Sequence, residues 1–199
     1  NMVFNTNHFS TYAIGHNKMI FNDVAEEAWY QGAVTFIAAR NFTSGTGNDN
    51  FSPDASLTRG QFITLLLKAY EIKGDASFEN NFADAGNTYY TDYLATAKKL
   101  GISEGIGNNL FGPEREITRE DMFVMLYKTL EITEQLPKVM SEKGLSDFYD
   151  SGNVATYAQK AINYLIEANI IGGNNSNLSP REITTRAQMA QVLYKLMKK

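Results

Sequence analysis

A short motif, Thr-Arg followed by two variable residues, occurs three times along this chain of 199 residues. The Thr of each copy follows a proline by five residues, and an apolar stripe with helical spacing comes after the motif. The copies are Thr58-Arg59-Gly60-Gln61, Thr118-Arg119-Glu120-Asp121 and Thr185-Arg186-Ala187-Gln188. Recurrence at a period of roughly sixty residues indicates three copies of one supersecondary unit. Any site that the motif builds is therefore expected in up to three copies.

Each unit is predicted to contain two helices joined by a loop rich in Gly and Asn. Gly and Asn readily adopt the left-handed conformation that closes a helix, so they mark the expected end of the first helix. These residues are Asn41, Gly101 and Asn169. The second helix starts at the motif, with apolar residues at i, i+3, i+4 and i+7. Three such units must bury their stripes against one another, which predicts an all-α assembly with internal pseudo-threefold order.

The chain is predicted to divide into four segments. Residues 3–14 alternate and are rich in β-formers, so residues 1–19 are expected to form an extended remnant of an upstream domain or linker. The three repeats are expected at residues 20–74, 75–138 and 139–199, and are called repeats 1, 2 and 3 below. The chain starts abruptly at Asn1-Met2-Val3-Phe4 without the pattern of a signal peptide, so we expect it to be part of a longer protein.

The Thr and the Gln of the motif have a structural explanation that needs no ligand. Thr followed three residues later by Gln is the signature of a capping box at a helix N-terminus. The pairs Thr58/Gln61 and Thr185/Gln188 fit this signature, and Thr118/Asp121 is a shorter variant. Phe51, together with Phe111 and Leu178 at matching positions, is expected to pin each loop to the core.

The arginine of the motif is not explained by capping, because a cation at the first helical position opposes the helix dipole by a few tenths to about 1 kcal/mol. One interpretation is that Arg59, Arg119 and Arg186, with free N–H groups of the helix start, bind a carboxylate or phosphate. The other is a structural salt bridge. Its candidate partners are the aspartates that open each unit, which can also be turn or N-cap residues: Asp23, Asp84 and Asp147.

Composition excludes several other functions. A net charge of −4 argues against a surface for nucleic acids, and no stretch approaches the roughly twenty apolar residues of a membrane span. There is no cysteine, so disulfides and Cys-ligated metals are excluded. Both histidines, His8 and His16, lie before the repeats, and no Ser/His pair or metal-ligand cluster recurs. We expect no enzymatic activity, such as that of a two-carboxylate glycosidase, no metal and no cofactor.

The combination of Phe-x-Asp, an aromatic residue, a Gly-rich loop and Thr-Arg-x-Gln, repeated three times, resembles S-layer homology (SLH) domains. The resemblance runs from Phe21 to Lys199. It implies a pseudo-trimeric, three-pronged assembly around a central helical bundle. It also implies an extracellular, cell-surface protein that anchors its upstream domain non-covalently to a Gram-positive cell wall. The implied partner is secondary cell-wall polysaccharide that carries pyruvate ketals on N-acetylmannosamine. An alternative role is protein–protein interaction or self-assembly in an S-layer.

The same resemblance implies binding grooves between neighbouring repeats. A ketal carboxylate would suit one arginine at a helix start. The site residues carried over from the family are Arg59, Arg119, Arg186, Gly45, Gly47, Gly105, Gly107, Gly173 and Trp29. A lone tryptophan such as Trp29 is more often a core residue than a platform for a ligand, and both interpretations stay open for it.

Several positions depart from the family pattern. Glu120 is expected to neutralise Arg119 in part, and Thr184 stands where the other copies have Leu57 and Ile117. The third loop is one residue shorter and has Asn174 in place of the second glycine. We therefore expect three non-equivalent grooves, with the loop of repeat 3 the least able to bind.

Overall fold

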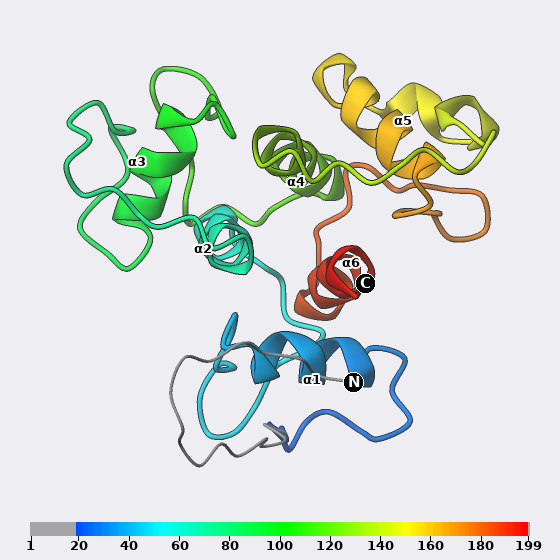
Figure 1. Ribbon diagram of the computed structural model, residues 1–199, viewed down its shortest axis with the longest axis horizontal. Helices are drawn as coiled ribbons and strands as arrows, with labels where there is room; N and C mark the ends of the chain where they lie inside the picture. The colour runs from blue at the N-terminus through cyan, green and yellow to red at the C-terminus, as the bar shows by residue number, and fades with distance from the viewer. Residues whose placement is uncertain (1–18, 199) are drawn as a thin grey trace, which may run out of the picture.

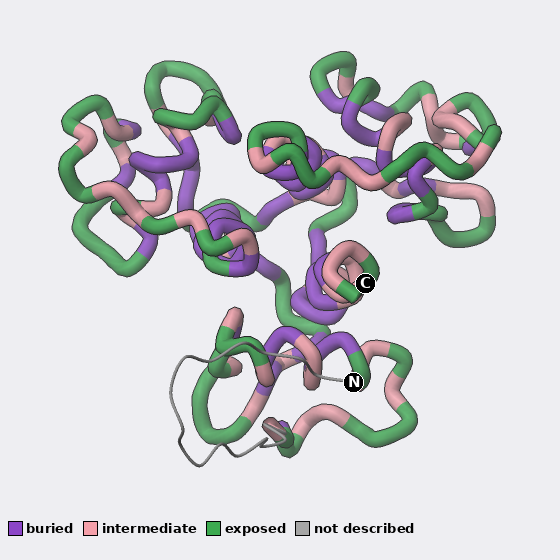
Figure 2. The backbone as a smooth tube through the Cα atoms, viewed as in Figure 1, coloured by how far each residue is buried: buried purple, intermediate pink, exposed green. Residues whose placement is uncertain are grey.

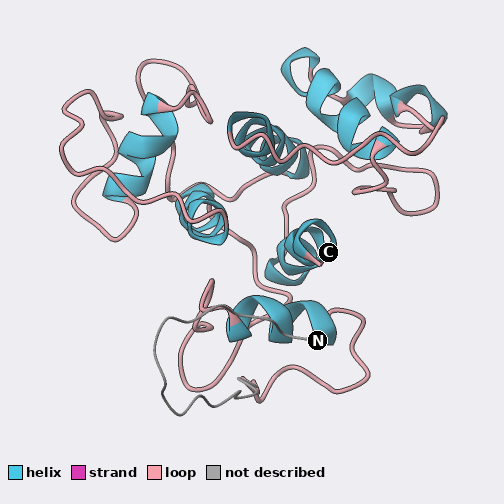
Figure 3. Ribbon diagram, viewed as in Figure 1, coloured by secondary structure: helices cyan, strands magenta, loops and turns pink. Residues whose placement is uncertain are grey.

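The computed structural model describes residues 19–198, and Figure 3 shows helices joined by long loops. Its six α-helices are α1 (Gln31–Ala39), α2 (Arg59–Ala69), α3 (Thr91–Lys99), α4 (Arg119–Ile132), α5 (Gln159–Glu167) and α6 (Arg186–Met197). Short 3₁₀ turns at Leu145–Asp147, Ser151–Asn153 and Thr156–Ala158 precede α5. Only isolated β-bridges occur in the described chain, which confirms the all-α class. The predicted extended stretch, residues 3–14, and both histidines lie outside the described residues.

The predicted end of each first helix and the predicted start of each second helix are confirmed. The residue that closes each first helix has positive φ: 60° at Asn41, 73° at Gly101 and 57° at Asn169. Each second helix begins at the motif arginine, with the preceding Thr as its N-cap. Reciprocal capping boxes form at α2 and α6, whereas at α4 Thr118 accepts a bond from the Asp121 N–H without a return bond.

The helices pair across repeats rather than within them. Helix α3 packs on α2, α5 on α4, and α1 on α6, so the first helix of each repeat contacts the second helix of another. Figure 1 shows three lobes built in this way, with the motif-bearing helices α2, α4 and α6 closest to the centre. Much of these three helices is buried (Figure 2). Residues from different repeats therefore meet in every lobe.

A closed ring of backbone hydrogen bonds joins the three motifs. The N–H of Leu57 donates to the carbonyl of Thr184 (3.1 Å), that of Thr184 to Ile117 (2.9 Å), and that of Ile117 to Leu57 (2.9 Å). Each residue directly precedes an N-cap Thr, and the side chains of all three are fully buried. The ring fixes the starts of α2, α4 and α6 relative to one another.

Thr184 is the one polar side chain in this ring, and its hydroxyl has no hydrogen-bond partner among the described residues. A buried polar group without a partner costs about 1–3 kcal/mol. We therefore expect Thr184→Val to raise the free energy of unfolding by about 1 kcal/mol, measured by urea denaturation. Thr64→Val is the control, because the Thr64 hydroxyl donates to the Gly60 carbonyl at 2.9 Å and should not gain. A loss of stability in Thr184→Val would contradict this expectation.

Each loop is fastened by an aspartate and a buried apolar residue. Phe51, Phe111 and Leu178 are at most 1% exposed, which confirms that they pin the loops. The Asp23 carboxylate accepts bonds from the N–H groups of Phe51 (2.8 Å) and Ser52 (2.7 Å). Asp84 does the same for repeat 2. Asp23 and Asp84 both lie in turns, as predicted, and each holds the loop of its own repeat.

The prediction of Asp147 as the third member of this set is wrong. In repeat 3 the loop amides of Leu178 and Ser179 donate to Asp150, at 2.8 and 2.7 Å. Asp147 instead ends a short 3₁₀ turn and accepts a bond from the Gly144 N–H. The sequence Phe148-Tyr149-Asp150 also has the Phe-x-Asp pattern, so the aspartate equivalent to Asp23 and Asp84 lies three residues later than predicted.

Candidate functional site

Three surface grooves each contain one motif arginine. Groove 1 contains Arg59 and has a volume of about 400 Å³, groove 2 contains Arg119 and has about 650 Å³, and groove 3 contains Arg186 and has about 350 Å³. Cavities of this size suit small ligands. The sequence-predicted arginines are thus placed in three separate grooves at corresponding positions of the fold.

Every groove draws residues from all three repeats. In groove 3, Arg186 of repeat 3 faces Tyr89 of repeat 2, while Gln61, Lys68 and the loop at Gly45 come from repeat 1. Groove 1 combines Arg59, Tyr157 and the α4 face in the same way, and groove 2 combines Arg119, Trp29 and the α6 face. The cross-repeat helix pairing produces this arrangement, so no single repeat can form a groove.

One edge of each guanidinium is used to hold the fold together. The Nε–H of Arg59 donates to the Phe111 carbonyl (2.9 Å), and that of Arg186 donates to the Phe51 carbonyl (2.7 Å). Arg119 makes the equivalent bond to Leu178 at 2.9 Å. Burial lowers the pKa of all three arginines from the usual value, although an arginine stays charged at neutral pH. The remaining edge of each guanidinium is what a ligand could contact.

The helix N–H groups do not take part in anion binding, contrary to our expectation that they are free. At α2 the N–H of Arg59 donates to Arg115, that of Gly60 donates to Pro113, and that of Gln61 donates to the Thr58 hydroxyl. The starts of α4 and α6 are satisfied in the same way. Carbonyls of the neighbouring repeat occupy these donors, so recognition of an anion depends on side chains.

The outer edges of the three guanidiniums have different partners. Arg59 Nη1 forms an ion pair with Asp121 Oδ2 at 2.5 Å. Arg186 Nη2 is buried and has no hydrogen-bond partner among residues 19–198. Arg119 likewise has no ion pair within the described chain. The salt-bridge interpretation is therefore correct for Arg59 alone, with Asp121 rather than Asp23, Asp84 or Asp147 as the partner.

Glu120 does not neutralise Arg119 as predicted. It is 7% exposed, and its Oε2 accepts a bond from the Ala155 N–H at 3.0 Å, which fastens repeat 3 to α4. Because consecutive helical residues point in different directions, it is the next residue, Asp121, that enters a groove and neutralises an arginine there.

Aromatic residues stand exposed at one equivalent position of each repeat. Trp29, Tyr89 and Tyr157 are 63%, 62% and 60% exposed. Trp29 is therefore not a core residue, and it borders groove 2. Its indole packs edge-on against Tyr30 at 5.2 Å, and Tyr89 packs against Tyr90 in the same manner at 5.0 Å. Each groove thus has an aromatic wall suited to a sugar ring.

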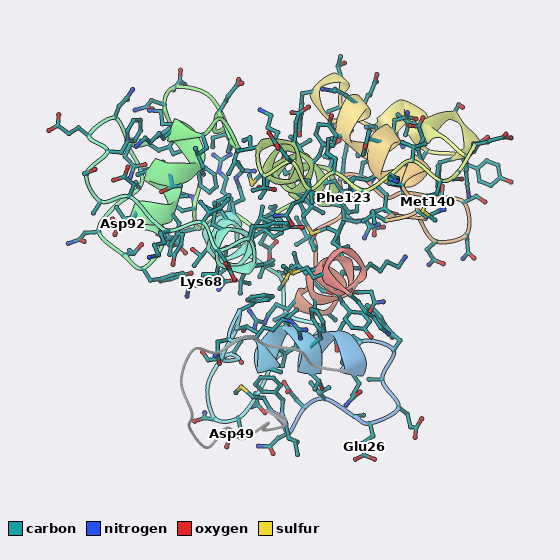
Figure 4. All side chains as sticks on the ribbon, viewed as in Figure 1. Glu26, Asp49, Lys68, Asp92, Phe123 and Met140 are labelled. Carbon is teal, nitrogen blue, oxygen red and sulfur yellow. The ribbon has the colours of Figure 1, made fainter. Side chains whose placement is uncertain are left out.

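A lysine also lies in each groove, and our sequence analysis missed it. Lys68, Lys128 and Lys195 occupy the same position of α2, α4 and α6 and line grooves 3, 1 and 2. Figure 4 labels Lys68 on α2, beside the junction of two lobes. The recurrence of a lysine nine residues after each motif arginine was a visible signal in the sequence.

The loop glycines have two different structural roles. A Cβ at Gly45, Gly105 or Gly173 would lie within 2.5 Å of a backbone carbonyl oxygen, and these glycines line grooves 3, 1 and 2. Gly47 and Gly107 line none of the three grooves. A Cβ there would contact nothing within 4 Å, but their φ values are +108° and +98°. The first set is needed for close backbone approach and the second for its conformation.

The shorter loop of repeat 3 closes with a related turn. Asn174 takes the place of the second glycine and exchanges two hydrogen bonds of 2.8 Å with Asn177. The residues between them, Asn175 and Ser176, both have positive φ, as do Asn48 and Asp49 in repeat 1. This loop lines groove 2, and its expected weakness in binding stays a prediction.

The number of carboxylates that line a groove falls from groove 1 to groove 3, while the number of cations stays the same. Groove 1 has two cations, Arg59 and Lys128, and two carboxylates, Asp121 and Glu104. Groove 2 has two cations and one carboxylate, Glu182. Groove 3 has two cations and no carboxylate among its lining residues. Attraction for an anion should therefore rise from groove 1 to groove 3.

The described residues show no group of three or more acidic or histidine side chains that could hold a metal ion. Nor is any helix within residues 19–198 both long and apolar enough to cross a membrane.

Comparison with known proteins gives a consistent picture. The S-layer homology domain model matches residues 20–63, 81–123 and 147–190. An amylopullulanase from Thermoanaerobacterium thermosulfurigenes is 28% identical over 200 residues, which is 100% of this chain and 10% of that protein. The exoglucanase XynX from Acetivibrio thermocellus is 30% identical over 182 residues, 90% of the chain and 16% of that protein. The S-layer protein sap from Bacillus anthracis is 26% identical over 175 residues, 88% of the chain and 21% of that protein. The chain thus spans a tenth to about a fifth of these relatives.

Proposed function

Because the chain belongs to the S-layer homology domain family, whose members anchor S-layer proteins and cell-surface enzymes to the cell wall, we propose that it binds pyruvylated secondary cell-wall polysaccharide. In this role it holds the upstream part of an exported protein on the outside of a Gram-positive cell. The three lobes act as prongs around the central helices, and the polymer lies in the grooves between repeats.

The observation that carries this proposal is Arg186 of groove 3, whose guanidinium has no ion pair and whose buried Nη2 has no hydrogen-bond partner among residues 19–198. A guanidinium donor withdrawn from water and left without an acceptor is costly, and a carboxylate is its best-matched partner. The ketal of a pyruvylated sugar supplies one carboxylate. Lys68 adds a second cation to the same groove, and Tyr89 adds an aromatic wall and a hydroxyl.

The proposal gives the chain a binding role and no catalytic one. Each groove contains an arginine and a lysine, but residues 19–198 contain no histidine that could act as a base beside them. The enzymes among the relatives match this chain over only a small share of their length. Several linked grooves would strengthen attachment to a repeating polymer by avidity.

A wall-binding assay tests the proposed function. The protein is incubated with purified wall sacculi, then with sacculi from which the secondary polymer has been extracted, and with sacculi whose pyruvate has been removed. Co-sedimentation is expected with the first preparation only. Retention on sacculi that lack the secondary polymer would contradict polysaccharide binding. Retention that survives removal of pyruvate alone would contradict recognition of the ketal carboxylate.

A further inference from the structure

Groove 1 differs from the other two in that a side chain of the protein already contacts its motif arginine. We propose that the Asp121 carboxylate occupies in groove 1 the position that a ligand carboxylate takes in groove 3. Groove 1 is then closed to anionic saccharides, and the chain binds them through grooves 2 and 3. This inference rests on the proposed function, and it identifies Asp121 as the residue that decides which grooves accept the ligand.

The Asp121 carboxylate bridges two groups that face each other across groove 1. Its Oδ2 accepts a hydrogen bond from Arg59 Nη1 at 2.5 Å, and its Oδ1 accepts one from the Tyr157 hydroxyl at 2.8 Å. The Arg59 side chain is 4% exposed and that of Asp121 is 26% exposed. An added anion would have to displace a carboxylate that is held at both oxygens.

Groove 3 contains the same two recognition groups without the internal carboxylate. Arg186 is equivalent to Arg59, and Tyr89 is equivalent to Tyr157. At the position of Asp121, groove 3 has Gln61. The Gln61 Oε1 is engaged elsewhere, because it accepts a bond from the Thr58 N–H at 3.1 Å. Arg186 consequently has no ion pair within residues 19–198. Its Nη1, the counterpart of the Arg59 atom that Asp121 contacts, has no partner there, and its buried Nη2 has none either. A ligand carboxylate that bridges Arg186 and the Tyr89 hydroxyl would reproduce the bonds of Asp121.

The length of the side chain explains why Asp121 contacts the arginine of groove 1, whereas Gln61 and Gln188 do not contact the arginines of the other grooves. Gln61 and Gln188 reach back to the N–H of their N-cap Thr and complete capping boxes. Asp121 is one methylene shorter, and no return bond to Thr118 forms at α4. Its carboxylate is therefore available to Arg59 across the repeat boundary. Gln188 in groove 2 is tied back like Gln61, so Arg119 has no internal anion from this position.

Electrostatics favours the same assignment. The loop aspartates Asp23, Asp84 and Asp150 are equivalent in the three repeats and do not distinguish the grooves. The lining carboxylates do distinguish them, because groove 1 has two, groove 2 has one and groove 3 has none. Burial and the bond to Asp121 raise the pKa of Tyr157, so its hydroxyl stays a donor to the internal carboxylate.

Reciprocal substitutions test this inference. The probe is a soluble saccharide that ends in pyruvate-ketal N-acetylmannosamine, and NMR chemical-shift perturbation assigns binding to individual grooves. The wild-type protein is expected to bind at grooves 2 and 3. Asp121→Gln should add binding at groove 1, since the variant side chain matches Gln61 and Gln188. Gln61→Asp is the matched control and should weaken binding at groove 3 at least tenfold, because the new carboxylate can reach Arg186.

The outcomes separate the inference from the function on which it rests. Binding at all three wild-type grooves, or no gain at groove 1 in Asp121→Gln, would overturn the assignment of Asp121 and leave the proposed function intact. Unchanged affinity at groove 3 in Gln61→Asp would overturn the assignment as well. Failure of the probe to bind groove 3 of the wild type would overturn both. Because the two variants lie in different repeats, loss of folding in one leaves the other as a test.

Discussion

Phe51→Ala is expected to lower the free energy of unfolding by about 3–5 kcal/mol, the usual cost of truncating a fully buried phenylalanine. The Phe51 ring is 0% exposed and packs against Phe21 with ring centroids 5.6 Å apart. The Arg186 guanidinium lies over the ring at 4.7 Å, and the Phe51 carbonyl accepts the Arg186 Nε–H. Truncation would thus leave a cavity under both the loop and the arginine of groove 3.

Urea denaturation followed by circular dichroism measures this effect. Tyr149→Ala is the control, because Tyr149 is 85% exposed and its loss should change stability by less than about 0.5 kcal/mol. A Phe51→Ala loss no greater than that of the control would show that the loop is not anchored through this ring.

Arg186→Ala is expected to weaken binding of a pyruvylated saccharide at groove 3 at least tenfold, since a hydrogen bond to a charged group contributes about 1.5–3 kcal/mol. The same substitution should lower the free energy of unfolding by about 1–3 kcal/mol, because the buried Phe51 carbonyl loses its donor. Both effects are expected together, since one edge of the guanidinium is structural and the other faces the groove.

Two further variants separate the effect on affinity from the effect on stability. Arg181→Ala removes the same charge from an exposed position and should leave both affinity and stability unchanged. Lys68→Gln removes the second cation of groove 3 from an exposed position on α2, so it should weaken binding without an equal loss of stability. Calorimetric titration at a temperature where each variant is folded gives the affinities. If Arg186→Ala loses stability but binds normally, the arginine is purely structural.

The features that could be predicted from sequence are those set by local chemistry. Thr58 and Gln61 announce a capping box because both partners of the reciprocal bonds lie within one helical turn. Asn41 and Gly101 mark helix ends because few other residues accept positive φ. Phe51 and Phe111, as large apolar residues in otherwise polar loops, had to be buried. None of these conclusions required knowledge of which segments meet in space.

The errors concern partners that are distant in sequence. The ion pair of Arg59 joins residues of two repeats that are 62 positions apart. The sequence around Arg59 therefore does not predict Asp121 as its partner. The occupied N–H groups of α2 have the same origin, because their acceptors, Arg115 and Pro113, are brought in by the ring of repeats. The error at Asp147 has a local cause instead. Two similar patterns, Leu145-Ser146-Asp147 and Phe148-Tyr149-Asp150, lie side by side, and the sequence alone favoured the first.

We propose that a groove arginine binds the carboxylate of the ligand. The most direct test compares the affinities of two forms of one ligand. Isothermal titration calorimetry of the wild-type protein would use a pyruvate-ketal N-acetylmannosamine saccharide and its methyl ester, which differs from it by one methyl group and has no charge. The acid is expected to bind at least ten times more tightly than the ester, because only the acid forms a charge-assisted bond to Arg186. Equal affinities for the acid and the ester would contradict the claim.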